Sequence, residues 1–314
     1  MQVEQIILAP MEGVIDEVMR DLLSNINQFD LCITEFIRVV DSLVPKHIYY
    51  KICPELYKGG LTSSNTPVRI QLLGQHPQWM AENAVRAIEL GSHGVDLNFG
   101  CPSKAVNKSK GGAILLKSPE EIYNITSTVK KALDKNDNLS VKIRLGFDDA
   151  SLLSEIVDSV VQSNANALTI HARTKKDGYK APAYWHIIGQ IQKKVNIPII
   201  ANGEIWHRND ALNCIKQSGT PNIMLGRGIL AMPNLAQTIR EGCNEMTWPQ
   251  LCNLLFTFSE IEKSASESFY FSSRLKQWLK YLKINYPEAN LLFDEIKKLK
   301  DKKLILQLIK NLSS

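Results

Sequence analysis

The chain has 314 residues, of which 44% are apolar and 22% are charged, and its formal net charge is +5. It has no run of 18 apolar residues, which excludes a hydrophobic membrane span, and its six cysteines include no C-x-x-C pair, which argues against structural zinc and disulfides. We therefore expect a soluble cytoplasmic protein without a metal, with one large domain and one small domain. The mild positive charge permits an anionic partner without requiring one.

Short apolar segments that are typical of β-strands alternate with helical patterns up to about residue 230. The expected strands are 6–9, 31–34, 68–73, 94–97, 140–145, 167–170, 197–201 and 222–225. Several are apolar throughout, as strands covered on both faces are. Eight strands with intervening helices favour a (β/α)8 TIM barrel, whose active site lies at the carboxyl ends of the strands. A doubly wound sheet is the competing architecture, but no G-x-G-x-x-G follows the first strand.

Two helices have clear boundary signals. A helical pattern over 77–90 is followed by Gly91. A second helix is expected to begin at Ser118, with Pro119 at its first position and Glu121 completing a capping box with the serine hydroxyl.

The fourth expected strand leads into a loop that carries Asn98, Cys101 and Lys104. The amide of Asn98 is suited to the edge of a nucleobase, the thiol of Cys101 to proton donation or nucleophilic attack, and the ammonium of Lys104 to an anion. Most free cysteines are small buried hydrophobic residues. Cys101 lies between Gly100 and a proline, where a turn exposes it, so we favour a functional role.

A cluster that contains at least one polar side chain follows or lies within the end of each expected strand. In chain order they are Pro10, Met11, Glu12 and Gly13; Glu35 and Arg38; Gln71; Asn98 and Cys101; Lys142 and Arg144; His171 and Arg173; Asn202, Gly203 and Glu204; and Gly226, Arg227 and Gly228. Any one of them alone is typical of a satisfied core polar group, but the carboxyl ends of barrel strands share one rim. The set therefore predicts an active site at that rim.

The glycine-containing turns after the seventh and eighth strands fall where barrels commonly bind phosphate, and Arg227 adds positive charge there. Lys142, on the fifth strand, requires an anionic or electron-rich partner. Flavin mononucleotide (FMN) satisfies both requirements. Lys142 would contact the N1–O2 edge of the flavin ring and Gln71 the N3–O4 edge.

Helical patterns alone follow from about Met246, and we divide the chain into a barrel domain, 1–245, and a helical domain, 246–314. The helical domain has 11 Lys and Arg against 7 Asp and Glu, which accounts for most of the excess positive charge. The residues expected to form its core are Trp278, Leu279, Tyr281, Leu282, Leu291, Leu292 and Phe293. The lysine runs over 297–303, taken alone, are typical of a solvated helix face.

The motifs together resemble the tRNA-dihydrouridine synthase family. They are LAPMEGVID (8–16), RIQLLG (69–74), VDLNFGCPSKAVNKSKGGA (95–113), VKIRLG (141–146), HART (171–174), ANGEI (201–205) and MLGRG (224–228). CITEFIRVVD (32–41) and RLKQWLKYL (274–282) most resemble the C-type bacterial branch, which is associated with uridine 16 of the tRNA D-loop. Ile15 stands where many members have threonine, away from the catalytic groups that the resemblance implies.

The resemblance implies that NADPH reduces bound FMN, that reduced FMN gives hydride to C6 of a flipped-out uracil, and that Cys101 protonates C5. It also implies a monomer that binds tRNA. The expected FMN-binding residues are Pro10, Met11, Glu12, Gln71, Lys142, His171, Asn202, Gly203, Glu204, Gly226 and Arg227. The expected tRNA-binding residues are Arg38, Asn98, Arg173, Tyr179, Arg274 and Lys276.

Two other functions are compatible with parts of this pattern. An enzyme like dihydroorotate dehydrogenase would also be an FMN barrel with a cysteine that acts on a pyrimidine, but it would not need a basic helical domain. A non-catalytic RNA-binding barrel would not need Cys101, Lys142 or the two phosphate-type turns. A flavin absorbance spectrum would separate this second alternative from an enzyme.

Overall fold

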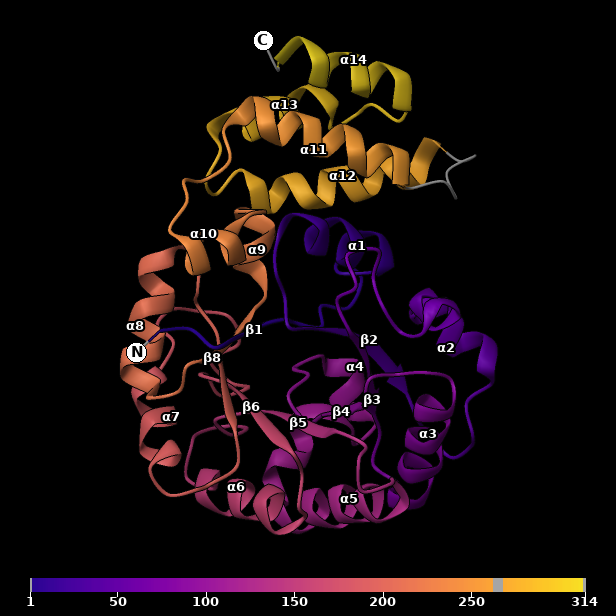
Figure 1. Cartoon of the computed structure of the whole chain (residues 1–314), viewed down its shortest axis with the longest axis vertical. Helices are drawn as coiled ribbons and strands as arrows, with labels where there is room; N and C mark the ends of the chain where they lie inside the picture. The colour runs from indigo at the N-terminus through magenta and orange to yellow at the C-terminus, as the bar shows by residue number, and fades with distance from the viewer. Residues whose placement is uncertain (1, 262–267, 313–314) are drawn as a thin grey trace.

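The computed structural model describes residues 2–261 and 268–312, and within them eight parallel strands close into a barrel in sequence order (Figure 1). The strands are β1 Gln5–Leu8, β2 Leu31–Arg38, β3 Val68–Leu73, β4 Val95–Asn98, β5 Leu139–Arg144, β6 Ala167–His171, β7 Ile199–Asn202 and β8 Asn222–Leu225. Each overlaps the segment that the sequence predicted, and β1 pairs with β8 to close the barrel. The (β/α)8 fold is confirmed.

Helices surround this barrel and connect its strands (Figure 1). They are α1 Glu17–Ile26, α2 Lys46–Ile52, α3 Pro77–Glu89, α4 Lys104–Lys108, α5 Pro119–Ala132, α6 Leu153–Gln162, α7 Trp185–Gln192, α8 Arg208–Ser218, α9 Arg227–Ala231 and α10 Leu235–Glu241, with 3-10 turns η1 Pro54–Lys58 and η2 Gly112–Lys117. Pro119 opens α5 as predicted, but the expected capping box is wrong. The Ser118 side chain makes no capping bond, and its carbonyl instead accepts the N–H of Glu121.

The interior of the barrel is polar on one side and apolar on the other. Ile7, Ala9, Ile33, Ile200 and Met224, from β1, β2, β7 and β8, form a buried apolar cluster. On the opposite side, the register places Gln71 of β3 beside Asp96 of β4, and Asp96 beside Ser140 of β5. Side chains two residues apart on a strand share a face. The polar side of the barrel therefore leads upward to Asn98 and Lys142 at the rim.

Four further helices form a compact layer on one side of the barrel, beyond α1, α9 and α10, where α12 contacts α9 and α11 contacts α1 (Figure 1). They are α11 Trp248–Ile261, α12 Ser268–Leu282, α13 Pro287–Ile296 and α14 Lys302–Leu312. Trp278 of α12 is buried against Phe258, and its indole N–H donates to the carbonyl of Leu230 in α9 at 3.0 Å. The predicted core is confirmed for Trp278, Leu279, Leu282 and Leu292, whereas Leu291 is exposed.

Arg274 joins this helical layer to the loop between β1 and α1. Its guanidinium donates to the carbonyls of Gly13 and Val14, both at 3.0 Å, and pairs with Asp16 at 2.6 Å. The other carboxylate oxygen of Asp16 accepts the N–H of Met19 and so caps α1. Arg274 is buried, so its guanidinium holds two parts of the protein together in this structure.

Arg274→Ala should lower the free energy of unfolding by about 3–5 kcal/mol, because it removes the cation paired with Asp16 and the donor to the carbonyl of Val14, whereas the carbonyl of Gly13 keeps the amide of Gln277. Lys276→Ala, in the same helix, removes a bond to the carbonyl of Leu299 within the helical layer and should cost about 1 kcal/mol. Urea unfolding of the two variants measures this difference. Equal losses would show that Arg274 does not hold the two parts together.

Candidate active site

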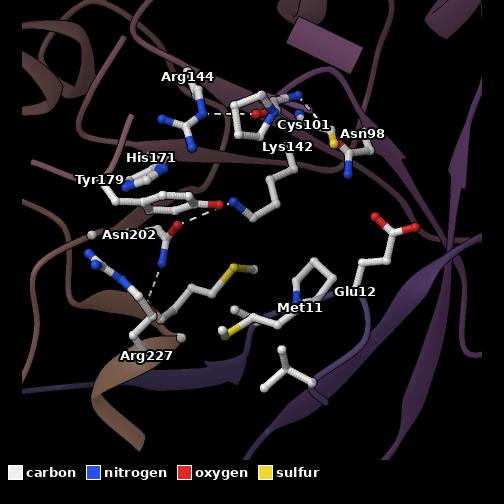
Figure 2. Close-up of a pocket in the computed structure, with 18 of the residues that line it drawn as sticks. Met11, Glu12, Asn98, Cys101, Lys142, Arg144, His171, Tyr179, Asn202 and Arg227 are labelled. Atoms are coloured by element: carbon white, nitrogen blue, oxygen red, sulfur yellow. Dashed lines mark hydrogen bonds between the residues drawn. The ribbon is translucent and has the colours of Figure 1, made fainter. Parts of the chain in front are cut away.

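A cavity of about 450 Å³ opens at the carboxyl ends of the barrel strands (Figure 2). Most of the residues predicted from the sequence line it. They are Pro10, Met11, Glu12, Gln71, Asn98, Cys101, Lys142, His171, Tyr179, Asn202, Gly203, Glu204, Gly226 and Arg227. Its volume lies in the range of pockets that bind small molecules and cofactors. The fold thus brings together residues that are up to about 200 positions apart in the chain.

Four other predicted residues lie outside the cavity wall. Arg38 is exposed at the end of β2 and bonds to the hydroxyl of Ser109. Arg173 is fully buried behind Glu204, with which it forms an ion pair. Arg274 and Lys276 of α12 have the intramolecular partners described above.

The loop after β4 holds Cys101 in a defined position. The side-chain oxygen of Asn98 accepts the backbone N–H groups of both Gly100 and Cys101, each at 2.9 Å. Burial raises the pKa of the Cys101 thiol above its ordinary value, a rise that the backbone N–H of Ser103 opposes only in part. The side chain is therefore a neutral thiol at neutral pH. This suits a proton donor better than a nucleophile, which must be ionised.

Lys142 faces this loop from β5 and is a cation in a poorly solvated position. Its ammonium donates to the side-chain oxygen of Asn202 at 3.2 Å, and the amide of Asn202 donates to the carbonyl of Met224. Burial, followed by repulsion from Arg144, lowers the pKa of Lys142 to about 8. Lys142 is therefore mostly charged at pH 7, and a nearby electron-rich group would stabilise its charge.

His171 lies at the end of β6, where the strand register pairs it with Arg144 of β5 (Figure 2). Burial lowers the pKa of His171 well below its ordinary value, and the charges of Arg144 and Lys142 lower it further. Its imidazole is therefore neutral at pH 7. A neutral imidazole has one donor and one acceptor nitrogen with which to contact a ligand.

Arg144 was recognised on its strand but was given no role from the sequence. Its guanidinium donates to the carbonyl of Gly100 at 2.8 Å and to the carbonyls of Thr174 and Gly178. It thus ties the Cys101 loop to the loop that carries Tyr179, whose ring it also contacts. Arg144 lies two residues beyond Lys142, and the period-2 alternation of a strand would have placed both side chains on one face.

Tyr179 is half exposed at the cavity mouth and lies between two guanidinium groups. Its ring centroid is 5.3 Å from Arg144 and 4.9 Å from Arg227. Arg227 also lies 5.0 Å from the ring of Trp206. Cation–π contacts of this kind hold an aromatic ring in place. Tyr179 thus presents an ordered aromatic surface at the entrance to the cavity.

The turn after β7 contains a carboxylate paired with two arginines. Burial alone would raise the pKa of Glu204, but hydrogen bonds from Arg173 and Trp206 lower it below its ordinary value. Arg227 lies 3.4 Å from the same carboxylate oxygen. Nη1 of Arg173 is buried without a hydrogen-bond partner among the described residues. This unpaired donor and the net positive charge make the turn suitable for an anion.

Two glycines let the backbone come close at this end of the cavity. A Cβ on Gly203 would lie 2.7 Å from the ring of His171, and Gly203 has a φ of +116°. A Cβ on Gly228 would lie 1.9 Å from the carbonyl of Ile205. The strand-end turns predicted to bind phosphate therefore require glycine at these positions. These turns and the guanidinium of Arg227 are the kind of site that the phosphate of a bound FMN would require, and Lys142 offers a cation for an electron-rich ring.

Tyr281 of α12, predicted from the sequence only as part of the helical core, also lines the cavity. It comes from the C-terminal helices, so no strand-end pattern points to it. Trp206, two residues beyond Glu204, was missed as well. The packing of α12 against the barrel places Tyr281 at the rim.

Within the described residues, no group of three or more His, Cys, Asp or Glu side chains is arranged to hold a metal ion. The described helices also include none with the length and apolar character that crossing a membrane requires.

The closed barrel and the cluster of titratable groups at its rim define the chain as a (β/α)8-barrel enzyme. The family model described as dihydrouridine synthase (Dus) matches residues 7–312. The chain belongs to the dihydrouridine synthase family.

Curated relatives support this assignment over nearly the full length of the chain. A tRNA-dihydrouridine(16) synthase of Shewanella oneidensis is 52% identical over 93% of this chain and 93% of its own length. One from Haemophilus influenzae is 51% identical over 93% of this chain and 95% of its own length. One from Yersinia pestis is 49% identical over 98% of this chain and 99% of its own length.

Solved structures with the same fold are much more distant in sequence. Histamine dehydrogenase from Rhizobium sp. 4-9 is similar with a TM-score of 0.56 and 14% identity, over 82% of this chain and 49% of that chain. An old yellow enzyme homologue from Zymomonas mobilis is similar with a TM-score of 0.53 and 13% identity, over 79% of this chain and 93% of that chain. At these identities the likeness shows the fold alone.

Lys142→Met should stabilise the apoprotein at pH 7. The folded-state pKa is about 8 and the ordinary value is 10.5, so the unfolded chain binds more protons between these pH values. The contribution of Lys142 to stability therefore rises with pH across that window. The variant should exceed the wild type by up to about 3 kcal/mol at pH 7, and the gap should close by about pH 10.5.

Urea unfolding of the flavin-free protein between pH 7 and 10.5 measures this gap. Lys131→Met, at an exposed position on α5, is the matched control and should show no such pH dependence. A constant gap between the Lys142 variant and the wild type would contradict the lowered pKa.

Proposed function

We propose that this protein reduces the C5–C6 double bond of a uridine in the tRNA D-loop, at position 16, to 5,6-dihydrouridine. The observation that carries the proposal is the neutral thiol of Cys101, held by Asn98 in a cavity whose other wall has the cation Lys142. The relatives named above, which are tRNA-dihydrouridine(16) synthases, support the substrate and its position.

The residues of the cavity would hold FMN. Lys142 and Gln71 would contact the two edges of its ring, while Arg227 and the turns at Gly203 and Gly226 would hold its phosphate. Also assigned to FMN binding are Pro10, Met11, Glu12, His171, Asn202 and Glu204. FMN reduced by NADPH would supply the hydride that C6 of the uracil accepts.

The chain's own residues then account for the proton and for the position of the base. Cys101 donates its proton to C5, so that one hydride and one proton saturate the double bond, and solvent reprotonates the thiolate. Asn98 retains one free amide N–H, which can donate to a carbonyl oxygen of uracil. A stacked base cannot reach such a cavity, so the uridine must be flipped out, and Tyr179 lies where it would enter.

We assign catalysis to 1–245 and tRNA binding to 246–314. The excess of Lys and Arg in the second segment suits a polyanion, and Tyr281 connects that segment to the catalytic cavity. Arg38 and Lys276 are proposed to contact the tRNA. Arg173 and Arg274 are proposed to orient it indirectly, through the turn at Glu204 and the docking of α12. A monomeric cytoplasmic enzyme is part of the same proposal.

Cys101→Ala should purify with bound flavin and oxidise NADPH at the normal rate, because no substrate proton takes part in that half-reaction. Formation of dihydrouridine should fall by about 10²–10⁴-fold, the usual contribution of a general acid. Mass analysis of tRNA incubated with the variant gives the rate. Cys243→Ala, at the other half-exposed cysteine, is the matched control and should retain full activity. Wild-type activity in Cys101→Ala would exclude the proposed role.

Lys276→Ala should weaken tRNA binding and flatten its salt dependence. Each lost phosphate contact lowers the slope of log K against log salt by about 0.7–0.9. Bound flavin and NADPH oxidation should not change, because Lys276 lies outside the cavity wall. Binding measured across a salt series tests this, and mapping of dihydrouridine in the product tests whether site 16 is lost. An unchanged slope would leave Lys276 with only its bond to Leu299.

A further inference from the structure

A continuous chain of hydrogen bonds runs from the buried side of the barrel to the Cys101 loop. Arg69 donates to the hydroxyl of Ser140 at 3.0 Å, and that hydroxyl donates to one carboxylate oxygen of Asp96 at 2.5 Å. The amide of Gln71 donates to the other oxygen of Asp96 at 2.7 Å. Asn98 donates to the side-chain oxygen of Gln71 at 2.8 Å and accepts the backbone N–H groups of the loop. We call these linked side chains the Asp96 relay.

The chemistry at the ends of the relay sets the direction of every bond in it. The backbone N–H groups of Gly100 and Cys101 can only donate, so Asn98 must present its oxygen to them and its nitrogen to Gln71. Gln71 must then accept with its oxygen and donate with its nitrogen. At the other end, the guanidinium of Arg69 can only donate, and it does so to Ser140.

Asp96 is the residue at which the two directions meet. Both of its oxygens accept, one from Gln71 and one from Ser140, and a carboxylate is the side chain that accepts on both sides. Its side chain is fully buried, as is that of Gln71, so water does not replace either partner. Burial raises the pKa of Asp96, and the hydrogen bonds from Gln71 and Ser140 oppose that rise.

We propose that Asp96 is a positioning residue: by accepting from the amide of Gln71, it holds Gln71 and Asn98 in the orientations that the loop N–H groups require, and through them it holds the Cys101 loop in position. Asp96 does not line the cavity, and Cys101 lies five residues further along the chain. As a consequence, Asn98 presents a donor to the cavity, which matches a carbonyl oxygen of uracil. The relevance of that donor to uracil rests on the proposed function, whereas the positioning of the loop does not.

Exchanging the aspartate at position 96 with the asparagine at position 98 should reverse the direction of the hydrogen bonds through Gln71 and still satisfy every group. Asn98→Asp alone places a carboxylate on each side of Gln71. The nitrogen of Gln71 faces Asp96, so its oxygen would face the new carboxylate, and two acceptors would lie against each other without a donor. In the double variant D96N/N98D, the amide introduced at position 96 can donate to Gln71 and accept from Ser140. Gln71 can then donate to the carboxylate introduced at position 98, whose other oxygen accepts the loop N–H groups. The exchange leaves the net charge of the protein unchanged.

The test is the rate of Cys101 alkylation by iodoacetamide in the flavin-free protein, read by mass spectrometry of peptides. Cys243, which contacts Asn234 and Thr238 away from the cavity, is the internal reference. Asn98→Asp should loosen the loop and raise the alkylation rate of Cys101 relative to Cys243. D96N/N98D should lower that relative rate again by about tenfold. Both variants carry the same new carboxylate beside Cys101, so their comparison isolates the effect of position 96.

Asp96→Asn alone should stay within about threefold of the wild type, because its oxygen can still accept from Gln71 while the Ser140 hydroxyl turns to accept its N–H. If Asn98→Asp does not fold, a folded D96N/N98D protein supports the proposal, because the second substitution has then restored the fold. Failure of both variants to fold overturns the proposal. Alkylation of D96N/N98D at least as fast as that of Asn98→Asp also overturns it. The assay contains no flavin and no tRNA, so its outcome is independent of the proposed function.

Discussion

The architecture of the site depends on one constraint, which is that polar groups enclosed in the barrel must satisfy one another. A buried donor or acceptor without a partner costs about 1–3 kcal/mol, and Gln71 and Asp96 are both fully buried. Their hydrogen bonds run across β3, β4 and β5 and end at the N–H groups that hold Cys101. The polar interior of the barrel is thus linked by hydrogen bonds to the loop that carries the Cys101 thiol.

Positive charge at the rim is the second organising feature. Lys142, Arg144, Arg173 and Arg227 all approach the cavity end of the barrel, where Glu204 is the carboxylate that pairs with two of them. Burial, followed by repulsion from neighbouring cations, lowers the pKa values of Lys142 and His171. An anionic, electron-rich ligand would relieve this repulsion, which is the physical reason why a flavin phosphate and ring suit the site.

The C-terminal helices contribute to the same site rather than only following it in the chain. Trp278 and Arg274 fix α12 against α9 and against the loop after β1, and Tyr281 of the same helix reaches the cavity. A partner bound on the helical layer would therefore be held at a fixed position relative to the catalytic rim. This is the arrangement that a modification of one base in a large nucleic acid requires.

The sequence by itself indicated the barrel, because eight apolar segments alternate with helical patterns and no G-x-G-x-x-G follows the first of them, as a doubly wound dinucleotide-binding sheet would favour. It also predicted most of the cavity wall, since the carboxyl ends of the barrel strands share one rim, although Arg38 and Arg173 at two of these ends lie outside the wall. It did not reveal that Arg173 and Arg274 are buried and paired with Glu204 and Asp16, because a charged residue in a motif reads the same whether it is free or paired. Only the tertiary structure decided those two pairings and the place of Tyr281 in the cavity wall. All three depend on the packing of segments that lie far apart in the sequence.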